Sequence, residues 1–147
     1  MKIIGTKQKD ITYTKRDGVY AIIERKQDEK IAIATNGNYF FLGGGIEQGE
    51  TELEALTREI KEEFGYTIKS IEYFDTVASY LYSQTRGYLD VTATFYIAEF
   101  DEKVAEPIEK DHQVLWVNPS EYKDKIYHEY QRYILEEYIK IKSKNSF

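Results

Sequence analysis

Residues 88–100 carry the most restrictive pattern in this sequence, because apolar or β-branched residues fall on both faces of the strand that they predict. The residues that would share one face are Val91, Ala93, Phe95, Ile97 and Glu99, and those on the other are Thr92, Thr94, Tyr96, Ala98 and Phe100. A strand of this kind needs a packing layer on each side. We therefore expect a sheet that is covered on both faces.

Shorter patterns predict the other elements. Strands are expected at residues 11–15, 19–25, 31–35, 38–42 and 113–117, with tight turns at Asp17-Gly18 and Asn36-Gly37. Residues 67–83 are predicted to form either one extended stretch or two strands. Pro119 opens a last helical region, in which the apolar residues at helical spacing are Ile126, Tyr130, Tyr133, Ile134, Tyr138 and Ile141. These elements predict a mixed sheet with helices on both sides, of class α/β or α+β.

Composition limits the class of protein. A chain of 147 residues, 41% of them hydrophobic, can form one domain with a substantial core. The absence of cysteine excludes disulfides and a thiol nucleophile and fits a cytoplasmic location. No apolar run is long enough to cross a membrane. A net charge of −6 argues against binding a nucleic-acid polymer but not against binding a small phosphorylated substrate.

Residues 43–66 join a glycine-rich turn to an acidic helix. Thr51 or one of its neighbours can cap the helix, and Gly65 is well placed to end it. The residues predicted to face the core are Leu53, Leu56, Ile60 and Phe64. The sequence thus predicts a helix whose register is fixed at both ends.

Three glutamates, Glu59, Glu62 and Glu63, lie beside that apolar stripe at spacings that bring their carboxylates together. Like charges at such spacings destabilise a helix by about 0.2–0.5 kcal/mol per pair. The cluster is either a solvated acidic face or a site for a divalent cation. Carboxylates without nearby histidine or cysteine suit Mg²⁺ or Mn²⁺ rather than zinc. We expect His112 and His128 to be structural or surface residues, since imidazole metal sites usually need several such ligands.

The stretch resembles the Nudix box, G-x5-E-x7-R-E-U-x-E-E-x-G-U, in which U is a bulky apolar residue. The matching residues are Gly44, Glu50, Arg58, Glu59, Ile60, Glu62, Glu63 and Gly65, with Tyr66 at the last apolar position. The family usually has proline where Leu42 stands here. The resemblance implies one Nudix hydrolase domain over residues 1–147, with the α/β/α sandwich fold of that family. It also implies Mg²⁺- or Mn²⁺-dependent hydrolysis of a nucleoside diphosphate linked to another group.

The resemblance also assigns metal ligands. Glu59 and Glu63 are expected to bind the ion, with Glu62 completing or adjoining the cluster and the Gly43 carbonyl as a further ligand. Many relatives recruit another glutamate from a loop beyond the box as metal ligand or general base. Glu109 is the best candidate here, and Asp111, Glu106 and Glu102 compete with it. A solvated acidic loop is the alternative.

Supporting residues form a second group. A carboxylate–guanidinium fork between Glu50 and Arg58 would tie the loop to the helix, with direct substrate contact as the alternative. Gly44 would allow the backbone to approach a ligand or ion closely, and Gly65 would end the helix.

The resemblance implies a small nucleotide as substrate, and the leading hypothesis is an ordinary or oxidised nucleoside triphosphate that is cleaved to monophosphate and pyrophosphate. Tyr82 stands where dinucleoside polyphosphate hydrolases have a tyrosine, which makes such a hydrolase the first alternative. A nucleotide sensor without activity is the second. Phe40, Phe41, Tyr80 and Tyr82 are candidates for stacking on the base, against plain packing. No membrane partner is expected, and the chain would act as a monomer or a homodimer.

Overall fold

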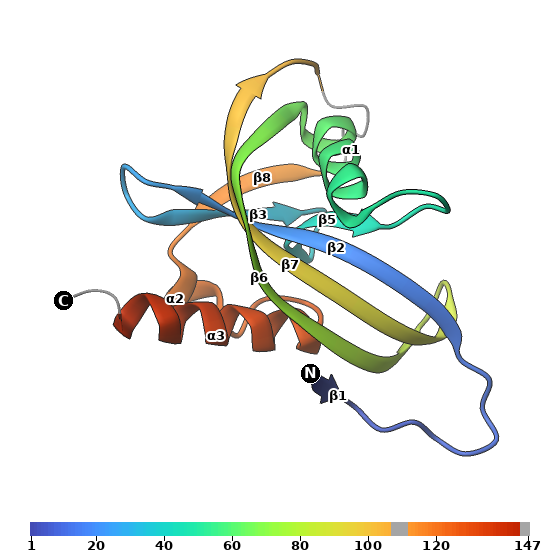
Figure 1. Ribbon diagram of the computed structural model, residues 1–147. Coiled ribbons are helices and arrows are strands. Elements are labelled where there is room, and N and C mark those ends of the chain that lie inside the picture. The colour runs from blue at the N-terminus through green and yellow to red at the C-terminus, as the bar shows by residue number, and fades with distance from the viewer. Residues whose placement is uncertain (107–111, 145–147) are drawn as a thin grey trace.

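The computed structural model describes residues 1–106 and 112–144, and these form a mixed sheet between helices (Figure 1). The strands are β1 (Lys2–Ile4), β2 (Thr14–Arg25), β3 (Lys30–Thr35), β4 (Tyr39–Phe40), β5 (Leu42–Gly45), β6 (Tyr66–Ser83), β7 (Gly87–Lys103) and β8 (Gln113–Val117). The helices are α1 (Glu52–Phe64), α2 (Pro119–Tyr122) and α3 (Glu129–Lys144). The predicted α/β class is confirmed.

Strand pairing places β2 at the centre of the sheet. The main order is β1-β6-β7-β2-β3-β4, while β5 pairs with β2 and β8 pairs with β3. The β1–β6 and β2–β7 pairs are parallel and the other pairs are antiparallel. Because β2 contacts both β7 and β5, it links the long strands to the glycine-rich segment.

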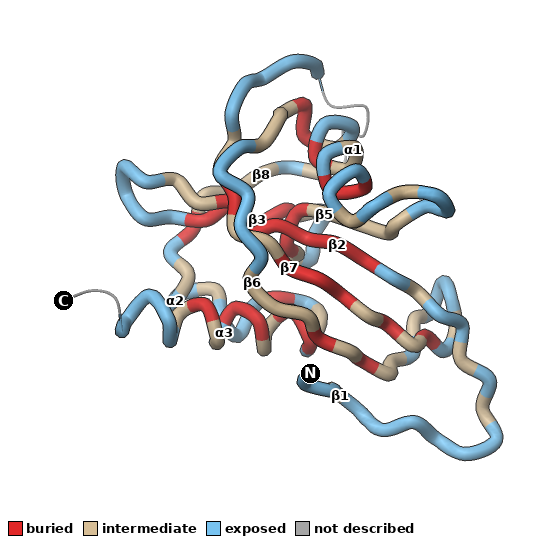
Figure 2. Tube along the Cα trace, viewed as in Figure 1, coloured by how far each residue is buried: buried red, intermediate tan, exposed pale blue. Residues whose placement is uncertain are grey.

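Alternate residues of β2 pack against different helices. Val19 and Ala21 belong to the core cluster that contains α1, while Tyr20 and Ile22 belong to the cluster that contains α3. Figure 2 shows the central part of β2 buried, between α1 on one side of the sheet and α3 on the other. The sheet is therefore covered on both faces, as the two-sided pattern predicts.

The pattern of residues 88–100 is confirmed in detail. Val91, Ala93 and Phe95 pack in the cluster with α3, and Ala98 packs with α1. The residues that α1 buries against the sheet are Ala55, Leu56, Ile60 and Phe64, and those of α3 are Tyr130, Gln131, Ile134, Leu135 and Tyr138. No helix within the described residues is long and apolar enough to cross a membrane.

The predicted turn at Asp17-Gly18 is wrong. Strand β2 continues through it, since residues 14–23 pair with β7 and residues 18–21 pair with β5. Tertiary pairing thus overrides the local turn preference. The strand predicted at residues 38–42 is divided into β4 and β5, and the glycines expected to form a turn lie in β5, paired with β2.

Other differences are smaller. Leu53 is 44% exposed because the first turn of α1 buries Ala55 instead, and Ile141 is 44% exposed where α3 extends beyond the core. Of the two alternatives for residues 67–83, the single extended stretch is observed, as one strand with three register shifts. The last helical region contains the short α2 before α3, and β1 was not predicted.

Candidate active site

Helix α1 has well-defined ends, which fix the direction of its acidic residues. The Thr51 side chain accepts a hydrogen bond from the Glu54 backbone N–H at 3.1 Å, and the Thr51 N–H donates to the Glu54 carboxylate at 3.0 Å. Gly65 has a left-handed conformation, and its N–H donates to the Lys61 carbonyl at 2.9 Å. This capping box and C-cap follow the predicted boundaries.

Glu59 packs directly against the backbone of β5. A Cβ atom on Gly44 would lie 2.7 Å from the Glu59 Cδ and Oε2 and 2.9 Å from Oε1. On Gly43, whose φ is 146°, a Cβ would lie 2.1 Å from the Val19 carbonyl oxygen. Any side chain at either position would therefore displace the carboxylate or the strand.

Arg58 connects the loop, the strand and the helix. Its Nε and Nη2 donate to the two Glu50 carboxylate oxygens at 2.7 and 2.9 Å, so the expected fork is present. Nη1 donates to Glu59 Oε1 at 3.0 Å, and Nη2 donates to the Gly45 carbonyl at 3.2 Å. The Arg58 hydrogen bonds, and then the N–H of Glu47, lower the pKa of Glu50 to about 2. The pKa of Arg58 is raised by the same pair.

Glu59 and Glu63 line a cavity of about 360 Å³ together with the backbone of Gly43–Gly45. Glu62 does not line it. The Glu62 side chain is 49% exposed, against 15% for Glu59, and lies 3.5 Å from Arg58 Nη1. Within residues 1–106 and 112–144, no three acidic or histidine side chains converge on one point. The three carboxylates therefore do not come together as expected, and the assignment of Glu62 as a ligand stays a prediction.

The donors at this cavity fit a hard divalent cation. Glu59 and Glu63 present carboxylates one helical turn apart, and Gly44 leaves space that the Glu59 carboxylate fills. Oxygen ligands of this kind suit Mg²⁺ or Mn²⁺. Glu109, the expected additional acid, lies outside the described residues.

A larger cavity of about 770 Å³ adjoins the first. The residues that line both cavities are Arg16, Tyr20, Asn36, Phe40, Arg86 and His128. The smaller cavity thus opens into a space with two guanidinium groups and several aromatic rings, large enough for a nucleotide-sized ligand.

The four aromatic candidates are placed differently. Phe40 lines both cavities, whereas Phe41 is buried and packs edge-on against Phe95 at 5.6 Å, which is typical of a core residue. Tyr80 and Tyr82 line the larger cavity, and Tyr82 is 61% exposed. Their contact with a substrate stays a prediction.

Sequence reasoning missed the basic residues of the cavity. Arg16 lies on β2 four residues before Tyr20, and both residues line the two cavities. The alternation of side chains along a continuous strand would have predicted that Arg16 and Tyr20 lie on the same face. The wrongly predicted turn interrupted that alternation. Arg86 comes from the β6–β7 turn, and no local pattern indicates its position.

Both histidines line the smaller cavity, although they were expected to be structural or surface residues. The His128 ring stacks on Tyr130, with centroids 5.2 Å apart. Burial, and then the charges of Arg132 and Arg16, lower the pKa of His128. The ring is therefore neutral at pH 7 and acts as an aromatic surface rather than as a cation.

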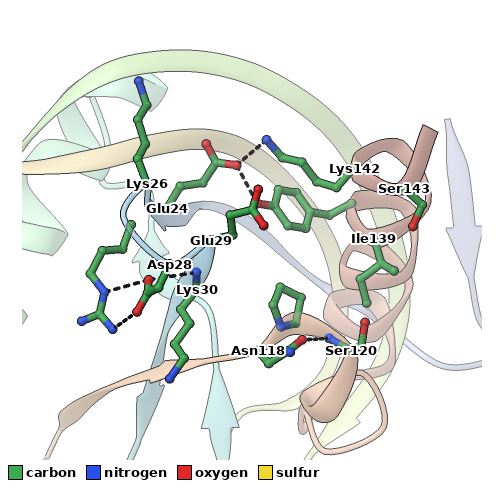
Figure 3. A pocket seen from close by; sticks show the side chains of 13 residues that line it. Glu24, Lys26, Asp28, Glu29, Lys30, Asn118, Ser120, Ile139, Lys142 and Ser143 are labelled. Carbon is green, nitrogen blue, oxygen red and sulfur yellow. Dashed lines mark hydrogen bonds and ion pairs between the residues drawn. The ribbon is translucent and has the colours of Figure 1, made fainter. Parts of the chain in front are cut away.

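A third polar cavity, of about 740 Å³, lies near the C-terminal end of α3 (Figure 3). Glu24 accepts hydrogen bonds from the Tyr138 hydroxyl at 2.6 Å and forms an ion pair with Lys142 at 2.7 Å. Arg25 and Asp28 pair at 2.6 Å. Its lining includes none of the predicted site residues, and its arginine and the carboxylate of Glu24 are both paired within it.

Fold and site together define the class of protein: an α/β/α sandwich that places helix carboxylates against a glycine-rich strand, beside a basic cavity. The family model described as NUDIX domain matches residues 14–138, and the chain belongs to this family. It is a Nudix pyrophosphohydrolase, and the family hydrolyses nucleoside diphosphate derivatives, generally with divalent metal ions.

Solved structures support the fold. A NUDIX hydrolase from Nitrosomonas europaea superimposes with a TM-score of 0.70 at 17% identity, covering 85% of this chain and 88% of that one. The ORF135 protein of Escherichia coli gives 0.68 at 23% identity, with coverages of 91% and 95%. A MutT NUDIX hydrolase from Burkholderia pseudomallei gives 0.67 at 22% identity, with coverages of 84% and 97%. A search of curated protein sequences finds no match to this chain.

Proposed function

We propose that this chain hydrolyses nucleoside triphosphates, ordinary or oxidised, to nucleoside monophosphate and pyrophosphate. The observation that carries the proposal is the placement of Glu59 and Glu63 in one cavity, with the Glu59 carboxylate against Gly44. These two carboxylates and the Gly43 carbonyl would hold the divalent ion, with Glu62 joining them only after its side chain turns away from Arg58. When bound, the ion supplies charge neutralisation of the phosphate oxygens and activation of water.

The chain's own residues supply orientation. Arg58 holds Glu59 by one guanidinium nitrogen and Glu50 by two others, so the loop and the helix keep a fixed separation. The reaction joins a water oxygen to phosphorus while the bond between that phosphorus and the bridging oxygen breaks. A carboxylate accepts the proton of the water, and Glu109 is our candidate for this base. No covalent intermediate is required, which agrees with a chain that lacks cysteine.

Phe40 is our candidate for stacking on the base. It lines both cavities, and its ring centroid lies 5.7 Å from that of His128. The neutral His128 ring and Phe40 would provide apolar surface for a nucleobase. Phe41 is a weaker candidate because it is buried against Phe95.

One observation favours a dinucleoside polyphosphate hydrolase as the second candidate. The larger cavity contains Tyr80 and Tyr82, and these rings form edge contacts with Tyr13 and Tyr88 at 5.3 and 4.9 Å. Such a cluster could receive a second base. A sensor without activity is disfavoured because every acidic position of the box is present.

The test is an assay of products. The protein would be incubated with Mg²⁺ and a panel of nucleoside triphosphates, oxidised nucleotides, dinucleoside polyphosphates and nucleotide sugars. Monophosphate and pyrophosphate as the products of a triphosphate would support the leading proposal. Preferential cleavage of the dinucleoside substrates would replace it with the second candidate, and no turnover of any compound would favour the sensor.

A further inference from the structure

Two guanidinium groups face the cavities and have no partner within residues 1–106 and 112–144: Arg16, which is half-buried, and Arg86, which is exposed. Arg25 pairs with Asp28, Arg58 with Glu50, and Arg132 donates to backbone carbonyls. In contrast, the guanidinium groups of Arg16 and Arg86 form no hydrogen bond or ion pair with another residue among those that the structure describes. Both residues line the two adjoining cavities.

Arg16 lies next to the glycine-rich strand. Its Nη1 and Nη2 would be 3.2 and 3.3 Å from a Cβ atom on Gly45, so the guanidinium packs over that glycine. Its charge also acts on the far wall: after burial and Arg132 it helps to lower the pKa of His128, and it opposes the rise in pKa that burial causes at Tyr130. The Arg86 charge acts on Tyr20, which the Arg16 and Glu59 charges also reach. The larger cavity is lined by these two arginines and one acidic residue, Glu129, in a chain of net charge −6.

The order of these groups suggests a path for a phosphate chain. Glu59 and Glu63 line only the smaller cavity, Arg16 packs over Gly45 beside them, and Arg86 comes from the β6–β7 turn that borders the larger cavity. A diphosphate would bind at Glu59 and Glu63 through the divalent ion that these carboxylates would hold. A third phosphate would extend toward the two arginines, whose planar forks match phosphate oxygens.

We propose that Arg16 and Arg86 form a subsite for the phosphate beyond the cleaved linkage, and that they make the enzyme prefer nucleoside triphosphates over diphosphates. This inference rests on the proposed function. It adds the residues that would distinguish substrates by the number of their phosphates. Phe40 and His128, which line the same two cavities, would contact the base.

Binding of non-hydrolysable α,β-methylene analogues tests the subsite. Calorimetry in Mg²⁺ would compare a triphosphate analogue with the diphosphate analogue of the same base. We expect wild type to prefer the triphosphate, and Arg16→Gln or Arg86→Gln to weaken triphosphate binding about 10-fold, the scale of one charge-assisted hydrogen bond. Diphosphate binding should change less than about 3-fold. The ratio of kcat/KM for triphosphate over diphosphate should fall in parallel.

Lys15→Gln is the matched control. Lys15 neighbours Arg16 in β2 and carries the same charge, but it pairs with Asp17 and Asp90 at 3.6 and 3.8 Å and lines neither cavity. This variant should leave the triphosphate preference unchanged, and Arg16→Lys should retain part of it. Thermal unfolding would verify that each variant is folded.

Three results would overturn the subsite: no triphosphate preference in wild type, equal weakening of both analogues in the arginine variants, or a changed preference among bases with an unchanged phosphate preference. The last would place the arginines on the base, whose guanine edge also suits a guanidinium fork. Because the analogues report binding without turnover, a failure of the proposed hydrolysis is seen separately in the product assay.

Discussion

Helix α3 has a polar cavity at each end, and the two cavities differ in whether their arginines are paired. At the C-terminal end, Glu24 is held by Tyr138 and Lys142, and Arg25 by Asp28 (Figure 3). At the N-terminal end, beside His128 and Tyr130, Arg16 and Arg86 have no such partner among the described residues. Size does not distinguish them, since the volumes are about 740 and 770 Å³.

The difference indicates which cavity is built for a ligand. Charges that are matched within the protein stabilise the fold and leave little to attract an ion or substrate. The half-buried Arg16 guanidinium loses hydration without gaining a partner among the described residues, and an anionic ligand can restore that interaction, whereas Arg86 is exposed. The cavity with unmatched cations is also the one that adjoins Glu59 and Glu63.

The largest expected effect is on catalysis. Glu63→Gln should reduce kcat at least about 100-fold, the scale of losing one electrostatic stabiliser at a reacting centre. Steady-state hydrolysis of a triphosphate in Mg²⁺ measures it. Glu62→Gln is the informative control, since Glu62 lies outside the cavity. An equal loss in both variants would mean that Glu62 turns inward with the metal, and an unchanged rate for Glu63→Gln would remove Glu63 from the site.

A second change tests the contact between strand and helix. Gly44→Ala would place a methyl group 2.7 Å from the Glu59 carboxylate, so that side chain has to move. Misplacement of a ligand by about 1 Å costs up to about 100-fold in rate. We expect a loss of about 10- to 100-fold in kcat. Gly49→Ala is a control near the box, because no atom lies within 4 Å of its Cβ position, although its φ of 87° adds strain. Comparable losses in the two variants would contradict the proposed clash.

The third prediction concerns the cavity with matched charges. Glu24→Ala should leave the Tyr138 hydroxyl without its acceptor and lower the free energy of unfolding by about 1–3 kcal/mol. The kcat for a triphosphate should stay within about twofold of wild type, since Glu24 lines neither cavity of the candidate site, and surface substitutions usually change stability by less than about 0.5 kcal/mol. Urea unfolding and the same kinetic assay measure both quantities. In the background of Tyr138→Phe, Glu24→Ala should lower the free energy of unfolding by less. A large loss of activity would contradict the structural role of this cavity.

Local signals explain which parts of the site could be predicted. The helix α1, its caps at Thr51 and Gly65, and the Glu50–Arg58 fork depend on residues within one short segment, so their spacing in the sequence determines their geometry. The two-sided pattern of β7 likewise predicts a covered sheet. These features follow from periodicity and capping, which act over a few residues.

The basic cavity depends on contacts that are distant in the sequence. Arg16 comes from a strand, Arg86 from a turn and His128 from the position just before α3. Only the parallel pairing of β2 with β7 and the packing of α3 bring them together. Because a turn was predicted at Asp17-Gly18, the sequence did not predict that Arg16 and Tyr20 lie on the same strand. The nonlocal pairing that overrides that turn therefore also creates the part of the site that the sequence did not predict.

The smallest expected effect is an acid-dependent change in stability. The pKa of Glu50 falls from its ordinary value of 4.5 to about 2, first through Arg58 and then through the N–H of Glu47. A lowered pKa means that the folded state binds fewer protons, so this stabilisation is complete above pH 4.5 and is lost as the pH falls toward 2. Unfolding of wild type and Glu50→Gln should therefore differ most at pH 5 to 6 and converge near pH 2.

Comparison with Glu24→Gln sharpens this acid test. Glu24 also pairs with a cation, Lys142, but lies in the cavity at the other end of α3. The Glu50→Gln variant should combine its loss of stability at pH 5 to 6 with reduced activity, because the fork positions Arg58 and through it Glu59. Glu24→Gln should change stability alone. A Glu50→Gln variant with full activity would show that the Gly44 contact, rather than Arg58, determines where the Glu59 carboxylate lies.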